Sequence, residues 1–187
     1  MQKRSHKLLA SALLARTNGF SAKRYEWAFL FGSFQPDCNP LTYLKGSLRA
    51  YKLKGHNFSN SQHYINAHIQ RLQQRERWTV WQYYTLGKLT HYLADAFTYP
   101  HNENYREGLL DHRQYETALR LYFARCMAGR CLRGEECCRD LPRALDCLHR
   151  RYLRDRVSME QDVDYILEAT TLLMEGCHPA SGLGKTA

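Results

Sequence analysis

Glycine and proline are rare in this chain, and their scarcity is the feature that most constrains its fold. The 187 residues include 11 glycines and 5 prolines, and stretches such as 56–86 and 143–175 contain neither. Helices tolerate such stretches, whereas a many-stranded sheet needs frequent turns that are rich in both residues. With 44% hydrophobic residues, the chain can also bury a globular core. We therefore predict an all-α protein.

Apolar residues recur at helical spacing in seven segments. Gly32 and Gly176 are interpreted as helix stops, and Thr79 as a helix cap. The predicted helices are Ser5–Arg16, Ala22–Phe31, 59–77, Val80–Phe97, Leu110–Met127, Pro142–Leu153 and Met159–Glu175. The sequence thus predicts a single-domain multi-helix bundle over residues 3–176, followed by a flexible tail over residues 177–187.

The chain is basic, with a formal net charge of +9 at pH 7. A basic surface attracts nucleic acid, anionic membranes and phosphate esters, although a surface that only keeps the protein soluble gives the same charge. No apolar run is long enough to span a bilayer. The start, MQKRSHKLLASALLAR, has a basic front and a short apolar stretch without a clear cleavage site, so we interpret it as an amphipathic helix rather than a signal peptide. This predicts a cytoplasmic protein, with secretion as the alternative.

Seven cysteines are present, and five of them lie between Cys126 and Cys147. Their spacing fits no common zinc pattern of paired Cys-x-x-Cys motifs. We interpret them as reduced thiols, since a disulfide in this segment would indicate an oxidising compartment. The segment suggests no function of its own.

Metal-ligand residues stand in an unexpected place, the apolar stretch GKLTHYLADAFTYPHN. His91 and Asp95 are four residues apart, so a helix would project them from the same side. His101 follows Pro100, which ends the helix and turns the chain, so we expect His101 to face a neighbouring site. A later predicted helix also has a histidine followed four residues later by a carboxylate, His112 and Glu116. Two helices that each offer a histidine and a carboxylate are a known way to build a multi-metal site in a bundle.

Three further residues are candidate ligands: Asp37 in the loop QPDCNP, His56 in LKGHNF, and His6 in the first helix. Each candidate taken alone is equally typical of a structural or exposed residue. The two four-residue pairs together favour a metal site. Histidine nitrogen combined with carboxylate oxygen suits zinc.

Taken together, these residues resemble the zinc-dependent phospholipase C family, whose relatives include the secreted single-strand-specific zinc nucleases. The family's His-x3-Asp-x5-His signature matches His91, Asp95 and His101, and its His-x3-Glu signature matches His112 and Glu116. The resemblance implies an all-helical bundle with a zinc cluster in a surface cleft.

Earlier positions extend the resemblance in the same order along the chain. The family's early Ser-His is similar to Ser5–His6, its loop aspartate to Asp37, and its later histidine beside an aromatic position to His56. The resemblance covers roughly Ser5 to Glu116. Cys38 stands where the phospholipase has an aromatic residue, so substrate choice is not fixed by the match.

The resemblance implies two to three zinc ions per chain. One zinc would be held by Asp37, His56, His91 and Asp95. A second would be held by His101, His112 and Glu116. A third would share Asp95 and use His6. In the family the backbone of an N-terminal tryptophan completes the third site, and here the Met1 amino group or water would take that place.

The implied activity is that of a phosphodiester hydrolase, in which metal-activated water cleaves a glycerophospholipid to diacylglycerol and a phosphorylated head group. Asp37 would also accept the proton of the attacking water. Phe34, Phe58 and Tyr99 are candidate substrate-binding residues for the glycerol and acyl chains. The expected partner is a phospholipid, at a membrane surface.

Two alternatives stay open at this point. The same metals and fold would serve a single-strand nuclease or a phosphatase, and the net charge of +9 suits binding to a nucleic-acid backbone. A non-enzymatic alternative is a basic helical module that binds nucleic acid or membrane, with structural histidines.

Overall fold

The described part of the molecule is entirely helical. A computed structural model describes residues 1–38, 58–102, 105, 108–129 and 140–177. Two short 3-10 helices, η1 (Gln35–Cys38) and η2 (Tyr99–His101), accompany the α-helices. The α-helices are α1 (Lys3–Arg16), α2 (Lys23–Phe34), α4 (Phe58–Gln73), α5 (Val80–Ala96), α6 (Leu109–Gly129), α7 (Leu141–Arg154) and α8 (Met159–Cys177). No strand occurs among the described residues, and the predicted all-α class is confirmed.

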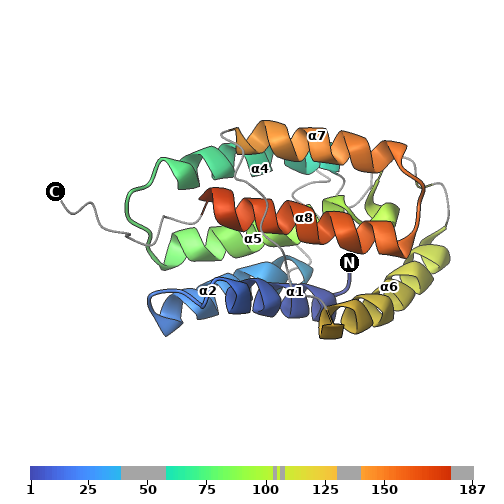
Figure 1. Ribbon diagram of the computed structural model, residues 1–187, viewed down its shortest axis with the longest axis horizontal. Helices are drawn as coiled ribbons and strands as arrows, with labels where there is room; N and C mark the ends of the chain where they lie inside the picture. The colour runs from blue at the N-terminus through green and yellow to red at the C-terminus, as the bar shows by residue number, and fades with distance from the viewer. Residues whose placement is uncertain (39–57, 103–104, 106–107, 130–139, 178–187) are drawn as a thin grey trace.

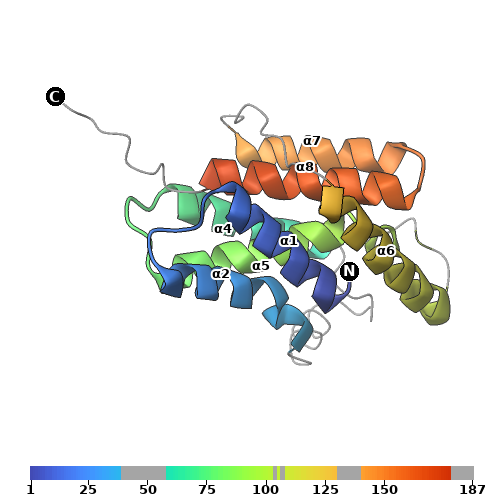
Figure 2. The ribbon, with the colours of Figure 1, turned by 60° about the horizontal axis from the view of Figure 1, so that its bottom comes forward.

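Helix α5 occupies the middle of the bundle. It packs against α1, α2, α4 and α8, so four helices enclose it. Figure 1 shows α4 and α7 above α5 and α8, with α1 and α2 below them. Figure 2 shows that α1 lies in front of α5, and that α6 crosses the end of the bundle near the N-terminus. None of the described helices combines the length and apolarity needed to cross a membrane.

The interior around α5 is apolar except at its last turns. Leu86, Leu89 and Leu93 have no exposed surface, and Phe97 beyond the helix end is equally buried. Burial of such side chains is the main favourable contribution to folding, about 25 cal/mol for each Å² removed from water. The polar residues that interrupt this core therefore need partners inside the protein.

Two glycines allow α2 and α5 to approach closely. A Cβ atom on Gly32 would lie 2.2 Å from the carbonyl oxygen of Tyr84, and one on Gly87 would lie 2.1 Å from that of Phe29. No side chain fits at either distance. The expectation that Gly32 ends its helix is therefore wrong, because α2 continues through it to Phe34. Gly32 serves helix packing instead.

Gly176 was also expected to be a helix stop, and α8 continues through it to Cys177. A Cβ atom on Gly176 would lie 2.8 Å from a methyl carbon of Leu141, so this glycine makes room for α7. The predicted cap of α5 is confirmed, since Thr79 and Gln82 form a reciprocal capping box.

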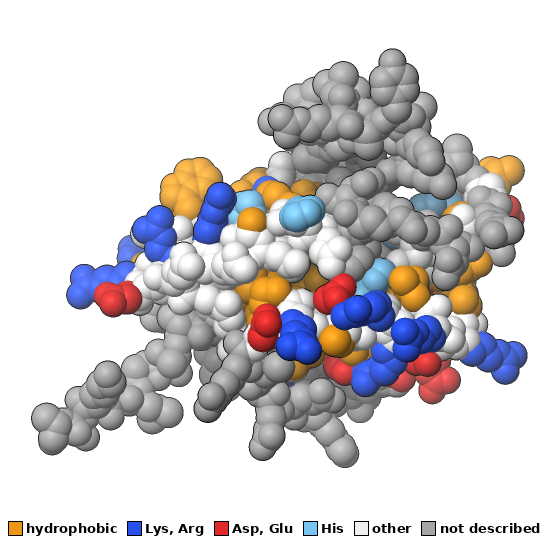
Figure 3. All heavy atoms as spheres, turned by 90° about the horizontal axis from the view of Figure 1, so that it is seen from above, with side chains coloured by type: hydrophobic (Ala, Val, Ile, Leu, Met, Phe, Trp, Pro, Cys, Tyr) orange, Lys and Arg blue, Asp and Glu red, His pale blue; other side chains and the backbone are white. Residues whose placement is uncertain are grey.

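The outer face of α7 carries charges of both signs. Arg150 lies 2.5 Å from Asp146, and Arg151 lies 2.7 Å from Glu168 of α8. Figure 3, viewed from the side that carries α7, shows basic side chains interspersed with acidic ones. The positive charge of the chain is therefore partly offset on this face.

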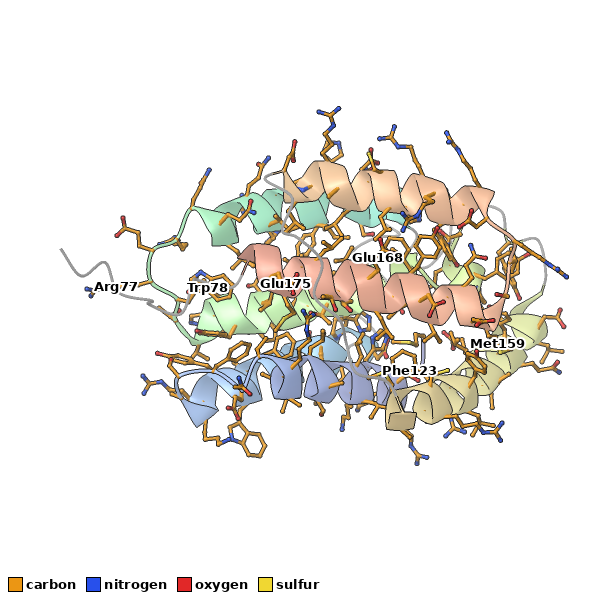
Figure 4. All side chains as sticks on the ribbon, viewed as in Figure 1. Arg77, Trp78, Phe123, Met159, Glu168 and Glu175 are labelled. Carbon is orange, nitrogen blue, oxygen red and sulfur yellow. The ribbon has the colours of Figure 1, made fainter. Side chains whose placement is uncertain are left out.

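Helix α4 ends at Gln73, earlier than the predicted end near residue 77. The indole of Trp78 explains the difference, because it is buried and donates a hydrogen bond to the carbonyl of Leu72 (3.3 Å). This bond satisfies a carbonyl of the last helical turn and brings the chain back toward the core. Figure 4 shows Trp78 among the helices, whereas Arg77 points away from them.

The close contact between α2 and α5 at Gly87 predicts a large effect of substitution on stability. Gly87→Ala should lower the free energy of unfolding by about 3 kcal/mol or more, because the added methyl group meets backbone that cannot move aside. Urea denaturation followed by circular dichroism measures the change.

Gly108→Ala is the matched control, since its Cβ would lie an ordinary 3.4 Å from an Asp111 oxygen. Equal changes in the unfolding free energy for the two substitutions would show that the α2–α5 contact does not require glycine at position 87.

Candidate metal centre

The last turns of α5 carry a histidine and an aspartate into the core. His91 and Asp95 are 0% and 1% exposed. Their Nε2 and Oδ2 atoms lie 3.2 Å apart, as expected for residues one helical turn apart. After α5 the chain turns through Thr98 into η2, which contains His101. One short segment thus supplies three of the predicted ligands.

His6 of α1 completes the first cluster. Its Nε2 atom lies 3.2 Å from Oδ1 of Asp95, and its ring stacks on that of His91 with centroids 4.0 Å apart. One donor atom from each of His6, His91 and Asp95 lies within 4.8 Å of the other two. Three such donors around one point are the number that proteins commonly supply to a zinc ion.

Asp37 approaches the same cluster from η1. Its two carboxylate oxygens lie 3.6 Å from Nε2 of His91 and 3.9 Å from Nε2 of His6. Burial raises the pKa of Asp37 to about 6. This carboxyl group can therefore hold or release a proton near neutral pH.

The orientation of His91 is fixed by α2. Its Nδ1 atom lies 3.0 Å from the carbonyl oxygen of Ser33. A carbonyl oxygen only accepts, so Nδ1 carries the proton and Nε2 presents its lone pair toward Asp95 and Asp37. A backbone partner on the second ring nitrogen is the usual support of a metal-binding histidine. The close packing of α2 on α5 makes this contact possible.

A second cluster joins η2 to α6. Oε1 of Glu116 lies 3.1 Å from Nε2 of His101 and 3.4 Å from Nε2 of His112. Donor atoms of these three residues also lie within 4.8 Å of one another. Burial opposes the charge of Glu116, but hydrogen bonds from His101 and His112 hold the pKa of Glu116 below its usual range. The second cluster therefore also contains two imidazoles and one ionised carboxylate.

The amino group of Met1 lies between the two clusters. Its nitrogen is 2.6 Å from Oδ1 of Asp95, and 3.0 Å from both Oε1 of Glu116 and Nε2 of His101. Burial alone would lower its pKa, but the carboxylates of Asp95 and Glu116 raise it to about 10. The two carboxylates therefore stabilise a positive charge at a point shared by both clusters.

The protonation states around this point suit a metal. Burial lowers the pKa of His6 to about 3, so its imidazole is neutral at pH 7. Burial opposes ionisation of Asp95 as well, yet the Met1 amino group and the neighbouring histidines hold its pKa well below the usual range. Neutral imidazoles and ionised carboxylates are the forms that bind a divalent ion. The donors present thus fit zinc.

Residues outside the clusters hold the η2 segment in place. Asp162 of α8 is 1% exposed, and its Oδ2 atom accepts hydrogen bonds from the backbone N–H of Tyr99 (3.0 Å) and the hydroxyl of Tyr115 (2.9 Å). Its Oδ1 atom accepts a third bond from the hydroxyl of Tyr152 (2.8 Å). Asp162 therefore ties the segment that carries His101 to α6, α7 and α8.

Asn102 anchors the other end of η2. Its amide donates to the carbonyls of Ala96 (3.1 Å) and Thr98 (3.0 Å), and its Oδ1 atom lies 3.0 Å from Nε2 of His149. Asp162 and Asn102 were not among the residues predicted from the sequence. Asp162 offered one signal, since it is an acidic residue on the apolar side of a helix that is otherwise acidic on its exposed side.

The remaining predicted residues are distributed as follows. Phe34 is half-buried next to Asp37, with the ammonium groups of Lys3 and Lys7 over its ring. Tyr99 packs edge-on against Tyr115 in the support of η2. His56 lies outside the described residues, and Phe58 is described only as the start of α4.

A helical bundle that gathers two sets of histidine and carboxylate donors defines a class, the helix-bundle proteins whose metal sites are built from side chains of facing helices. Residues 5–169 match the zinc-dependent phospholipase C family, and the chain belongs to this family. The family's enzymes are phosphoric diester hydrolases that depend on zinc, which confirms the predicted family, enzyme class and metal. The chain has no significant match among curated proteins or solved structures. The individual ligands and the number of ions stay predictions.

The support of η2 by Asp162 can be tested through zinc affinity. Asp162→Asn should weaken zinc binding by about tenfold or more, the usual effect of removing a residue that orients a metal ligand. Titration of the zinc-loaded protein with a competing chelator measures this affinity.

Asp164→Asn is the matched control, because Asp164 is an exposed acidic residue on the same helix. Equal zinc affinities in the two variants would show that Asp162 does not support the metal centre.

Proposed function

We propose that this protein hydrolyses glycerophospholipids to diacylglycerol and a phosphorylated head group. One observation carries the proposal: a single point, at the Met1 nitrogen, lies within 3.0 Å of donor atoms from both clusters. The clusters are therefore adjacent. Adjacent ions about 3.5–4 Å apart are the arrangement that holds both the attacking and the leaving oxygen of a phosphoryl group.

We assign the ligands as the family resemblance implies. Asp37, His56, His91 and Asp95 would hold the first ion. His101, His112 and Glu116 would hold the second. His6, together with Asp95, would hold a third. The donor group around Glu116 supports the second assignment. The donor group around Asp95 contains His91 and also His6, so it supports a site at Asp95 without dividing its ligands between two ions. His56 is assigned from the resemblance alone.

Zinc supplies two effects when bound, since it lowers the pKa of coordinated water toward about 7 and offsets negative charge on phosphoryl oxygens. The side chains supply the base and keep the ligands ionised. Asp37 accepts the proton of the attacking water, and its raised pKa of about 6 suits a base that works near neutral pH. Asp95 keeps its charge because the surrounding nitrogen atoms hold its pKa well below the usual range.

Substrate contacts are proposed for the aromatic residues beside the clusters. Phe34 lies one turn before Asp37, and Tyr99 lies two residues before His101. Their rings are suited to the glycerol and acyl part of a lipid. Phe58 is proposed for the same role from its position beside His56 in the sequence.

The nuclease alternative finds no support on the α7 face. A protein that follows a nucleic-acid backbone needs a continuous basic surface. On the α7 face, however, Asp146 and Glu168 pair with Arg150 and Arg151. The positive charge of the chain therefore does not form an unbroken track there.

The proposal is tested by zinc content and activity. The purified protein should contain two to three zinc ions per chain, and it should release a phosphorylated head group from phosphatidylcholine. Asp95→Asn should lower this activity by at least about 100-fold, because the amide is a weaker metal ligand and the variant loses zinc that would offset charge on the phosphoryl oxygens. The variant should also retain less zinc.

His63→Ala is the control, since this exposed histidine belongs to neither cluster and should change neither activity nor zinc content. A protein without zinc, whose melting temperature is unchanged by EDTA, would overturn the proposal. Activity on single-stranded DNA with none on phosphatidylcholine would also overturn it, in favour of a nuclease.

A further inference from the structure

Helices α2 and α5 expose large aromatic side chains on the outside of the bundle. Trp27 is 71% exposed, Phe31 is 52% exposed and Trp81 is 72% exposed. Single exposed apolar residues are common, but an adjacent group of large ones marks an interaction surface.

These side chains form one continuous group. Trp27 and Phe31 are one turn apart on α2, so they project from the same side. The ring of Phe31 stacks on that of Tyr84, with centroids 6.0 Å apart, and Tyr84 meets Trp81 edge-on at 6.2 Å. The aromatic group therefore crosses from α2 to α5, where the two helices are in close contact.

Lysines border the aromatic group. The ammonium nitrogen of Lys88 lies 5.7 Å from the ring centre of Tyr84. That of Lys7 lies 4.3 Å from the ring centre of Phe34, which meets Phe31 edge-on. We call this surface the aromatic–lysine face. It consists of Trp27, Phe31, Trp81, Tyr84, Lys7 and Lys88.

The charge around this face is strongly positive. Helices α1, α2 and α5 contain only two acidic residues, Glu26 and Asp95. Asp95 is buried in the candidate metal centre, and Glu26 is paired with Lys23 at 2.9 Å. The lysines of the aromatic–lysine face therefore have little acidic charge near them on these helices. This contrasts with the mixed charges around α7.

We propose that the aromatic–lysine face docks on an anionic phospholipid surface. Tryptophan and tyrosine favour the interface between lipid head groups and acyl chains, where ring and polar atom are both accommodated. Lysines near such a surface each contribute about 1 kcal/mol of attraction to acidic lipids. A protein partner fits less well, because lysine is depleted in protein–protein interfaces.

The position of the face relative to the candidate metal centre supports this partner. Trp27 lies two turns before Phe34, about 10 Å along the helix axis, and Asp37 follows Phe34 in the next turn. On α5, Trp81 begins the helix whose last turns hold His91 and Asp95. Docking of the face would thus place the lipid surface beside the end of α2 that leads to Asp37, with His91 about 15 Å along α5 from Trp81. This inference rests on the proposed function, since it places phospholipid next to the site.

Intrinsic fluorescence gives a direct test. The zinc-loaded full chain is mixed with vesicles of phosphatidylcholine and phosphatidylserine phosphonate analogues, in which a methylene group replaces the scissile oxygen. Trp27 and Trp81 should show a blue-shifted emission on binding. Trp78 is only 8% exposed and serves as an internal control. Trp27→Phe combined with Trp81→Phe should remove the shift.

Variants test which side chains bind. Trp27→Ser combined with Trp81→Ser should lower partitioning onto these vesicles by about tenfold or more, because two large apolar surfaces are lost. Lys7→Gln combined with Lys88→Gln should lower partitioning by about tenfold on vesicles that contain phosphatidylserine, and leave it unchanged on phosphatidylcholine alone. Vesicle sedimentation measures both effects.

Val157→Ser is the matched control, since Val157 is 52% exposed in the connection between α7 and α8, at the opposite end of the bundle from the start of α2 (Figure 1). All variants should keep full activity on a soluble short-chain phosphatidylcholine. A loss confined to vesicle substrate supports docking through this face.

Two results would overturn the inference. One is unchanged vesicle partitioning in the double tryptophan variant. The other is a dimer in solution that becomes a monomer in this variant, which would assign the face to a second copy of the chain. Failure of the proposed function has a separate signature: vesicle binding would persist without any hydrolysis of soluble or vesicle phospholipid.

Discussion

The carboxylate of Asp95 is the feature around which the candidate site is organised. A charged carboxylate at 1% exposure is strongly unfavourable unless positive or hydrogen-bonding groups surround it. Here His6, His91 and the Met1 amino group all lie within 3.2 Å of its oxygens. Segments from α1 and α5 therefore meet at this point. A divalent ion in the same place would bring more positive charge than the single ammonium group that contacts Asp95 in the structure.

This charge is held in place by packing some distance away. The glycine contacts at Gly32 and Gly87 let the backbone of α2 approach α5. The same approach puts the Ser33 carbonyl 3.0 Å from His91, and η1 then places Asp37 beside the cluster. Asp162 has a similar role at the other cluster, where it fixes the backbone before His101. The positions of the candidate metal ligands thus depend on contacts made by other residues.

The sequence predicted the parts of this arrangement that are local. His91 with Asp95, and His112 with Glu116, could be recognised because a helix fixes the relation between residues four apart. The helices themselves followed from the absence of glycine and proline in long stretches. The proximity of these two pairs depends on tertiary structure. It was predicted only through the resemblance to a family.

The errors have a physical cause in common. Gly32 and Gly176 were interpreted as helix stops, yet both lie inside helices and make room for a neighbouring helix. Local sequence does not distinguish these uses of glycine. Asp162 was missed for the same reason, because its three hydrogen-bond donors come from distant parts of the chain.

The α2–α5 pair connects the interior of the molecule with its surface. On the inner side, it carries Ser33, His91 and Asp95. On the outer side, it carries the exposed rings of Trp27 and Trp81. Because two glycines bring the backbones into contact, one helix cannot slide past the other without a clash between backbone atoms. The distance between the exposed aromatic rings and the buried ligands is therefore set by the packing of the two helices.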